Sequence, residues 1–209
     1  MVVVVLALLC AAGAGGPPPG FDDEDEAQDG PPVPRAQLFI SPAGKPFRAP
    51  AGQPYPVAVW FAEADRNHDG RLTREELRAD TEAWFRTLDR NTDGVIDMPE
   101  VTRWEEDLVP EITRVASGGG GPRDRRSAVG RNELNTGRLG AAPYSLVNEP
   151  HPIRGADTDL SQSVSLAEFR AAADRRFALL DVDGDGAVAF ADLRPTLAQP
   201  RSERPAGRR

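Results

Sequence analysis

The apolar positions of this chain recur at helical spacing in several short segments. Residues 72–88 and residues 165–180 each carry an apolar stripe at intervals of three and four. The stripes consist of Leu72, Leu77, Trp84, Phe85 and Leu88 in the first segment, and of Leu166, Phe169, Phe177 and Leu180 in the second. The pattern therefore predicts a mainly α fold built around these two helices.

Three further segments favour helices, each with a proline that sets a limit. Residues 56–64 begin with proline, which the first turn of a helix tolerates. Residues 99–115 predict a helix that Pro110 should kink or end, and residues 190–197 a short one that Pro195 should break. Residues 37–53 hold a few apolar positions among Pro and Gly, and we expect an extended arm laid on the core.

Segments rich in Pro, Gly and charge separate the helical parts. We expect residues 17–36 to be a disordered, acidic and Pro-rich linker, and residues 117–140 to be a flexible Gly/Arg linker. Residues 199–209 should form a disordered tail. These boundaries leave two folded halves, residues 37–116 and residues 141–198.

The N-terminal residues 1–16 suggest export. Their apolar run, residues 2–10, is too short to span a bilayer, and residues 12–14 (AGA) fit the small-residue pattern of a signal-peptidase site. We therefore expect a signal peptide and a secreted or periplasmic protein, without stable membrane insertion. A basic start is missing, so lipidation at Cys10 and an unprocessed tail remain alternatives.

The charge of the chain favours cations over nucleic acid. The net charge is −8, whereas phosphate backbones require clustered Lys and Arg. The arginines of residues 114–131 have no interleaved aromatic residues, and we do not expect nucleic acid as a partner. Cys10 is the single cysteine, which leaves the redox compartment undecided.

Oxygen-bearing side chains recur at fixed positions in four twelve-residue segments. Calcium takes six to eight hard oxygen ligands at about 2.3–2.6 Å. A loop meets this need with side chains at positions 1, 3, 5, 9 and 12 and a backbone carbonyl at position 7, while glycine at position 6 allows positive φ.

The first two segments fit at every position. In residues 65–76 (DRNHDGRLTREE) the predicted ligands are Asp65, Asn67, Asp69, the carbonyl of Arg71, Thr73 and Glu76. In residues 89–100 (DRNTDGVIDMPE) they are Asp89, Asn91, Asp93, the carbonyl of Val95, Asp97 and Glu100. Asp97 adds a carboxylate at position 9, so we expect the second loop to bind more tightly.

The last two segments each depart from the pattern. In residues 157–168 (DTDLSQSVSLAE) the predicted ligands are Asp157, Asp159, Ser161, Ser163, Ser165 and Glu168. Gln162 replaces the turn glycine there, at a cost of about 1 kcal/mol.

In residues 181–192 (DVDGDGAVAFAD) the predicted ligands are Asp181, Asp183, Asp185, the carbonyl of Ala187 and Asp192. Asp192 is one methylene shorter than glutamate, so calcium should bind more weakly there and Mg²⁺ should be rejected less. We expect three to four calcium ions in all.

These loops, with Phe85 and Leu88 before one and Phe177 and Leu180 before another, resemble the EF-hand motif of the calmodulin-like superfamily. The resemblance covers residues 56–115 and 156–197. The layout is also similar to that of secreted bacterial EF-hand calcium-binding proteins. The resemblance implies helix-loop-helix units that hold calcium.

The spacing of the loops constrains their pairing. Within each half the loops begin 24 residues apart, from 65 to 89 and from 157 to 181. One helix, about 24 Å long, must therefore leave the first loop and lead into the next, so the loops of one half cannot pair with each other. We expect two loop-helix-loop halves packed together as paired EF-hands. Antiparallel packing would join the first loop to the fourth and the second to the third, whereas parallel packing would join the first to the third.

We interpret the chain as an exported, non-catalytic calcium-binding protein in which calcium is structural or buffered at low affinity. The alternative is a calcium-dependent sensor or adaptor for an unidentified protein partner. Met98 is the one methionine outside the N-terminal segment, but Trp60, Trp84 and Trp104 could line a groove. We do not expect an enzyme, since His68 and His151 have no evident nucleophile partner and are expected to be exposed.

Overall fold

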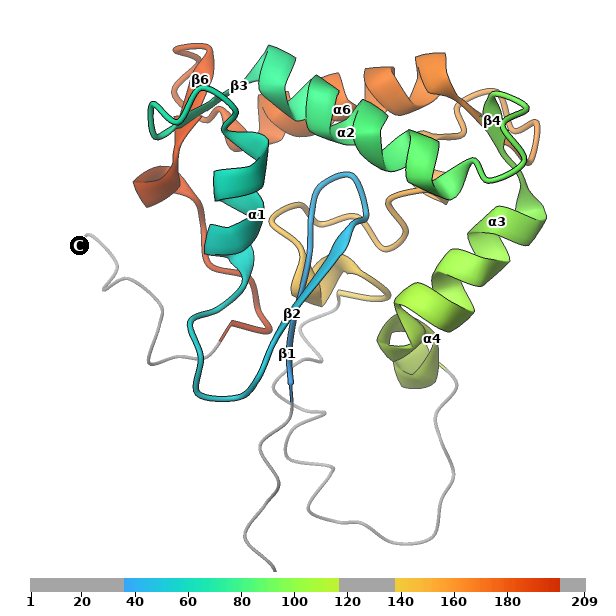
Figure 1. Ribbon diagram of the computed structural model, residues 1–209, viewed down its shortest axis with the longest axis horizontal. Helices are drawn as coiled ribbons and strands as arrows, with labels where there is room; N and C mark the ends of the chain where they lie inside the picture. Colours follow the sequence, from blue (N-terminus) through green and yellow to red (C-terminus); the bar gives the residue numbers. More distant parts are fainter. Residues whose placement is uncertain (1–35, 117–137, 200–209) are drawn as a thin grey trace, which may run out of the picture. The chain divides into compact units, whose positions relative to one another are not determined.

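The computed structural model describes residues 36–116 and 138–199 (Figure 1). Five α-helices and six short strands lie in this described part. The predicted signal peptide, the two linkers and the tail fall outside it, apart from a few residues at their edges.

The first half contains two β-strands, then helices that alternate with short strands. Its elements are β1 Gln37–Ile40, β2 Pro46–Ala49, α1 Val57–Ala64, β3 Arg71–Thr73, α2 Arg74–Leu88, β4 Val95–Ile96, α3 Met98–Arg103, the π-helix η1 Trp104–Leu108 and α4 Pro110–Ala116. The second half has fewer helices. Its elements are the 3-10 turns η2 Ala142–Tyr144 and η3 Arg154–Ala156, then β5 Val164–Ser165, α6 Leu166–Leu180, β6 Ala187–Ala189 and the 3-10 turn η4 Phe190–Asp192.

The two long helices have the same construction. Each begins with a capping box, in which the side chain of Thr73 or Ser165 accepts a bond from the backbone N–H three residues later. Each is followed by an aspartate, Asp89 or Asp181, that opens the next loop and still donates its N–H into the helix. One helix therefore connects the two loops of each half, as the 24-residue spacing predicts.

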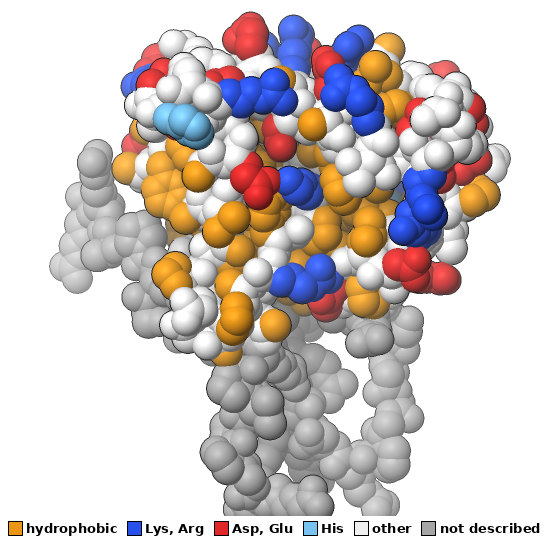
Figure 2. Space-filling model, viewed as in Figure 1, with side chains coloured by type: hydrophobic (Ala, Val, Ile, Leu, Met, Phe, Trp, Pro, Cys, Tyr) orange, Lys and Arg blue, Asp and Glu red, His pale blue; other side chains and the backbone are white. Residues whose placement is uncertain are grey.

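Helices α2 and α6 lie side by side and run antiparallel (Figure 1). Arg78 binds Asp174 with two hydrogen bonds of 2.6 Å, and Arg170 binds Glu82 at 2.7 Å. Along α2, basic and acidic side chains are interspersed on the face shown in Figure 2. These partly exposed pairs fix the relative register of the two helices more than they stabilise them.

Short strand pairs join the loops across the two halves. Strand β3 pairs antiparallel with β6, with Leu72 opposite Val188. Strand β4 pairs antiparallel with β5, with Ile96 opposite Val164. The first loop thus meets the fourth and the second meets the third, as antiparallel packing requires. The alternative that joins the first loop to the third is wrong.

The core is divided into two clusters, one beneath each pair of loops. The first cluster contains Phe39, Phe47, Tyr55, Val57, Trp60, Phe61, Ala64, Leu72, Leu77, Phe177 and Val188. The second cluster contains Leu38, Ile40, Ala43, Trp84, Phe85, Leu88, Ile96, Val101, Trp104, Val109, Ile112, Ala141, Ile153, Ala156, Val164, Phe169 and Ala172. The apolar residues at position 8 of paired loops enter the same cluster.

Strands β1 and β2 form an antiparallel hairpin that belongs to the core. Alternation along β1 sends Phe39 into the first cluster and Leu38 and Ile40 into the second. The indole N–H of Trp104 donates to the carbonyl of Gly44 in the hairpin turn at 2.8 Å. The segment is extended, as expected, but it is part of the core and not an arm laid on it, because its side chains enter both clusters.

Two of the predicted helices are interrupted before a proline, Pro110 in one and Pro195 in the other. In the segment predicted as one helix, residues 99–115, the α-helix α3 runs to Arg103 and is followed directly by the π-helix η1, which ends at Leu108. A separate helix, α4, begins at Pro110. Between them Val109 leaves the helical region, as residues before proline do. The helix predicted for residues 190–197 is wrong, because after the 3-10 turn Leu193 is already extended.

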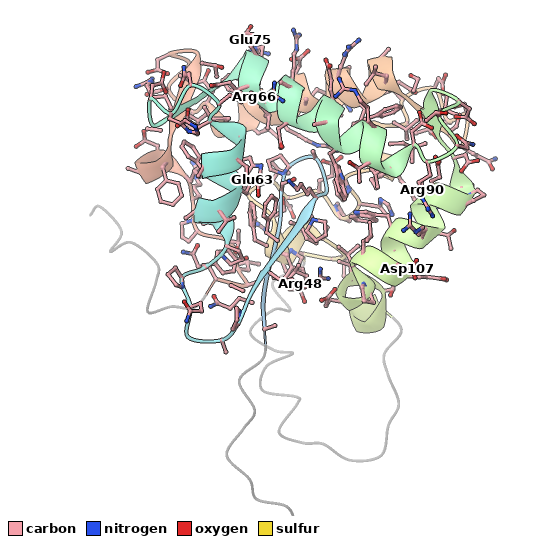
Figure 3. The ribbon with its side chains drawn as sticks, in the orientation of Figure 1. Arg48, Glu63, Arg66, Glu75, Arg90 and Asp107 are labelled. Atoms are coloured by element: carbon pink, nitrogen blue, oxygen red, sulfur yellow. The ribbon has the colours of Figure 1, made fainter. Side chains whose placement is uncertain are left out.

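A buried carboxylate joins α1 to α2. The indole N–H of Trp60 donates to Asp80 at 3.2 Å, and both side chains are buried. Burial raises the pKa of Asp80, while the bond from Trp60 and the charge of Lys45 oppose that rise. Glu63 and Arg66, labelled in Figure 3, are the other charged groups that act on it.

We expect Asp80→Asn to be neutral or stabilising by up to about 1 kcal/mol at neutral pH, because an amide still accepts from Trp60. Asp80→Ala should cost about 1–3 kcal/mol, since it leaves the buried indole N–H unpaired. The pKa of Asp80 is higher in the folded state, so the folded protein binds more protons between the two pKa values. Its stability should therefore fall as the pH rises through that window, and the advantage of Asn should grow.

Urea denaturation at several pH values in one buffer measures these differences. Glu106→Gln removes an exposed carboxylate of η1 that is not among the charges acting on Asp80, and it serves as the control. An alanine variant as stable as the asparagine variant would contradict the role given to Asp80.

Candidate metal centre

Each of the four loops is closed into a ring by the same kind of hydrogen bond, from a backbone N–H to a side-chain carboxylate. The aspartate at position 1 accepts from the backbone N–H at position 6 in every case. The bonds run from Gly70 to Asp65 at 2.8 Å, from Gly94 to Asp89 at 3.0 Å, from Gln162 to Asp157 at 3.0 Å and from Gly186 to Asp181 at 3.2 Å. Side chains at the intervening odd positions are thereby held on the same side as the first carboxylate.

The turn at position 6 uses positive φ, as predicted. The φ angles are 80° at Gly70, 87° at Gly94, 88° at Gly186 and 68° at Gln162. Position 4 also has positive φ, at His68 (57°), Thr92 (57°), Leu160 (60°) and Gly184 (73°), which the twelve-residue pattern does not predict. The third loop therefore holds two residues with side chains in a conformation that favours glycine.

In three of the loops, the glutamate at position 12 accepts hydrogen bonds from both ends of its own loop. Glu76 accepts from the N–H of Arg66 at 3.1 Å through one oxygen and from the N–H of Thr73 at 2.9 Å through the other. Glu100 and Glu168 repeat this arrangement. Glu100 accepts from Arg90 at 2.7 Å and Asp97 at 3.2 Å, and Glu168 from Thr158 and Ser165, both at 2.9 Å. Each glutamate thus reaches back to the start of its loop.

The residue at position 9 orients this glutamate by capping the helix that follows. Thr73, Asp97 and Ser165 each accept a bond from the backbone N–H of the glutamate three residues later. From the sequence pattern they are predicted only as ligands. The capping-box spacing, Ser, Thr or Asp followed three residues later by Glu, is the signal that indicates this second role.

Hydrogen bonds keep two of the position-12 glutamates, Glu76 and Glu168, ionised. Burial alone would raise the pKa of Glu76, but bonds from Thr73, Asn67 and Arg66 outweigh it and hold that pKa below its usual range. The backbone N–H of Ser165, helped by Thr158, lowers the pKa of Glu168 to about 2. These carboxylates are therefore negatively charged at neutral pH.

The first and second loops combine buried carboxylates with an amide. Asp65 and Glu76 are 5% and 9% exposed, and their counterparts Asp89 and Glu100 are 8% and 9% exposed. At position 3, the amide of Asn67 donates to the carboxylate of Asp69 at 2.9 Å, as that of Asn91 does to Asp93 at 2.8 Å. Two buried like charges and nearby hard oxygens fit a divalent cation such as calcium.

The third loop also brings its acidic ligands together. Oxygens of Asp157, Asp159 and Glu168 all lie within 4.8 Å of one another. The hydroxyl of Ser161 donates to the carbonyl of Ser163 at 3.1 Å, so these two predicted ligands are adjacent. The absence of a turn glycine has not opened this loop, because Gln162 adopts the same conformation.

The fourth loop brings together three of its four acidic residues. Oxygens of Asp181, Asp183 and Asp185 lie within 4.8 Å of one another, and Asp192 is not part of this group. Asp192 is exposed, at the end of a 3-10 turn, and within the described residues it makes no bond back to the loop. Ala189 at position 9 cannot cap a helix, so no capping box directs the residue at position 12.

The tryptophans and histidines singled out from the sequence differ in their surroundings. Trp60, Trp84 and Trp104 are buried, so they do not line a surface groove. His151 is half-buried rather than exposed: it lies against Trp104 and meets Glu105 at 2.8 Å. Burial lowers the pKa of His151, against the effect of Glu105. His68 is exposed at position 4 of its loop.

We expect Gln162→Gly to stabilise the protein by about 1 kcal/mol, because glycine adopts φ of 68° without strain. Gly94→Ala is the matched control with the opposite sign. A Cβ at Gly94 would meet no atom within 4 Å, so its cost of about 1 kcal/mol is conformational alone. Thermal unfolding of both variants measures the effect, and a destabilised glycine variant would show that Gln162 has a packing role.

Comparison of the sequence with known protein families agrees with this loop geometry in the first half of the chain. The family model described as EF hand matches residues 57–79 and 81–103, which contain the first two loops and their flanking helices. No curated protein matches the chain. Among the described residues, no helix has the length and apolar character needed to cross a bilayer. The two adjacent matches support an EF-hand family, whose members are generally calcium-binding and non-enzymatic.

Proposed function

We propose that this chain is an exported, non-catalytic protein that binds calcium through its four loops. The proposal rests mainly on the hydrogen bond that closes each loop, from the backbone N–H at position 6 to the aspartate at position 1. In three loops a glutamate completes that ring from the other side. An ion bound in one of these loops would take hard oxygens from the first aspartate, from the side chains that follow it and from the glutamate, which is the kind of ligand that calcium prefers.

The loops differ in how completely they surround an ion. The loops of residues 65–76, 89–100 and 157–168 are the stronger sites, because their glutamates offer two oxygens. The loop of residues 181–192 is open on the side of Asp192 and is the weaker site. Its smaller ligand number also discriminates less against Mg²⁺. Three to four calcium ions follow from this ranking.

The strand pairs support a paired arrangement of the sites. Strand β3 in the first loop is bonded to β6 in the fourth, and β4 in the second is bonded to β5 in the third. An ion that orders one loop therefore orders the strand that its partner needs. The well-formed second loop is the support that keeps the third loop in shape despite Gln162.

A structural role for calcium follows from where the helices begin and end. Helices α2 and α6 each start in one loop and finish in another, so four filled loops hold all four ends. Ions that bind only the folded state stabilise it in proportion to the logarithm of their concentration. Weak sites would suffice outside the cell, where calcium is plentiful, and the N-terminal apolar run supports that location.

The alternative function, a calcium sensor or adaptor, is less well supported. Its binding groove would have been lined by the three tryptophans, and all three are buried. Binding of a hydrophobic dye separates the two functions. A structural or buffering protein should bind no more dye after calcium is added, whereas a sensor should bind more.

The test of calcium binding is calorimetric titration of chelator-treated full chain, followed by circular dichroism. We expect Glu76→Gln and Glu100→Gln each to weaken one site by at least about tenfold, because each loses a bidentate carboxylate. Glu75→Gln is the matched control, since Glu75 is exposed and points away from the loop in Figure 3. Failure of the wild-type chain to take up calcium at millimolar concentrations would refute the proposed function.

A further inference from the structure

Arg71 belongs to two loops at once. Its carbonyl is at position 7 of the first loop, and strand pairing sets it opposite Ala189 of the fourth. Its guanidinium reaches across to donate to Oδ2 of Asp185, and lies 3.4 Å from the carbonyl oxygen of Ala187. Both are at predicted ligand positions of the fourth loop, positions 5 and 7.

The other loops show what Arg71 replaces. In the first and second loops, Oδ2 of the position-5 aspartate accepts from an asparagine amide at position 3 of the same loop. The fourth loop has Asp183 at position 3, which cannot donate when ionised. Arg71 supplies the donor instead, from a different loop, and it brings a positive charge.

The charge of Arg71 matters because three carboxylates meet there. Asp181, Asp183 and Asp185 lie close enough to repel one another, and Asp192 does not join them. The other oxygen of Asp185 accepts from the N–H of Ala187 at 3.0 Å. Together this N–H and Arg71 lower the pKa of Asp185, so both of its oxygens are already bound.

We propose that Arg71 is a tethered counter-cation that competes with calcium for Asp185 and so lowers the affinity of the fourth loop. The proposal rests on the proposed function, because it assigns a regulator to one of those sites. An ion that takes Oδ2 of Asp185 must displace the guanidinium, since two cations cannot share that oxygen closely. The fourth loop therefore fills last.

Among residues 36–116 and 138–199, a cross-loop contact of this kind is present at one of the four loops. In the second pair, the position-7 residue Val95 carries no charge, and position 5 of its partner loop is Ser161. In the reverse direction, Ala187 offers no side-chain charge to the first loop. Arg71 and Asp185 are about half exposed, at 46% and 45%, so the competition shifts the affinity without abolishing it.

The test follows each loop separately during a calcium titration of the full chain. The N–H of Gly186 donates to Asp181, so its ¹⁵N–¹H resonance reports the fourth loop, as that of Gly94 reports the second. We expect Arg71→Gln to lower the calcium midpoint at Gly186 by about two- to fivefold, which is the range for a surface charge pair. The midpoint at Gly94 should stay unchanged.

Two further variants separate displacement from general charge. Arg71→Lys keeps the charge but loses the planar fork, and its midpoint should lie between those of wild type and Arg71→Gln. Arg194→Gln removes one positive charge from an exposed residue just beyond Asp192, and it should leave the Gly186 midpoint unchanged.

The outcomes are distinguishable from failure of the proposed function. If Gly94 responds to calcium but Arg71→Gln leaves the Gly186 midpoint unchanged or raises it, the competition is refuted and calcium binding stands. An equal effect of Arg194→Gln would also refute it, in favour of overall charge. If no loop glycine responds in wild type, the proposed function and the role of Arg71 fail together.

Discussion

The hydrogen bond from the sixth backbone N–H to the first aspartate is the constraint on which the rest of the structure depends. It bends each loop into a ring, and the same aspartate ends the helix before it. The N–H of Asp89 donates to Phe85 and that of Asp181 to Phe177, while their carboxylates close the following turn. Helix and loop are therefore joined without a spacer, which fixes the direction in which each chain leaves.

The division of the core follows from this junction. A helix that carries a loop at each end cannot fold back on itself, so each loop finds its strand partner in the other half. The two loop pairs lie at opposite ends of α2 and α6, and each brings its own apolar residues inward. A segment that lies between the two core clusters needs apolar side chains on both of its faces. The strand that holds Phe39 and Ile40 meets that need, because its side chains alternate.

Features set by neighbouring residues could be predicted from the sequence, and features set by distant ones could not. The turn glycines and the ends of α2 and α6 depend on a few adjacent residues. Leu160 takes positive φ against its own preference because ring closure requires it. His151 is half-buried by Trp104 and Glu105, more than forty residues away. Four-residue strands carry too little alternation to reveal the hairpin.

The irregularities of the fourth loop form a single chain of causes. Ala189 cannot cap, so the exit helix shrinks to a 3-10 turn, and the residue at position 12 is not directed back over the ring. Asp192 therefore stays in solvent and the ring keeps three mutually repelling carboxylates. Their charge is balanced from outside by Arg71, which only the strand pairing brings there. A loop that is weakened locally thus depends on its partner for charge as well as for shape, so under the proposed function the pair, and not the single loop, is the unit that would respond to calcium.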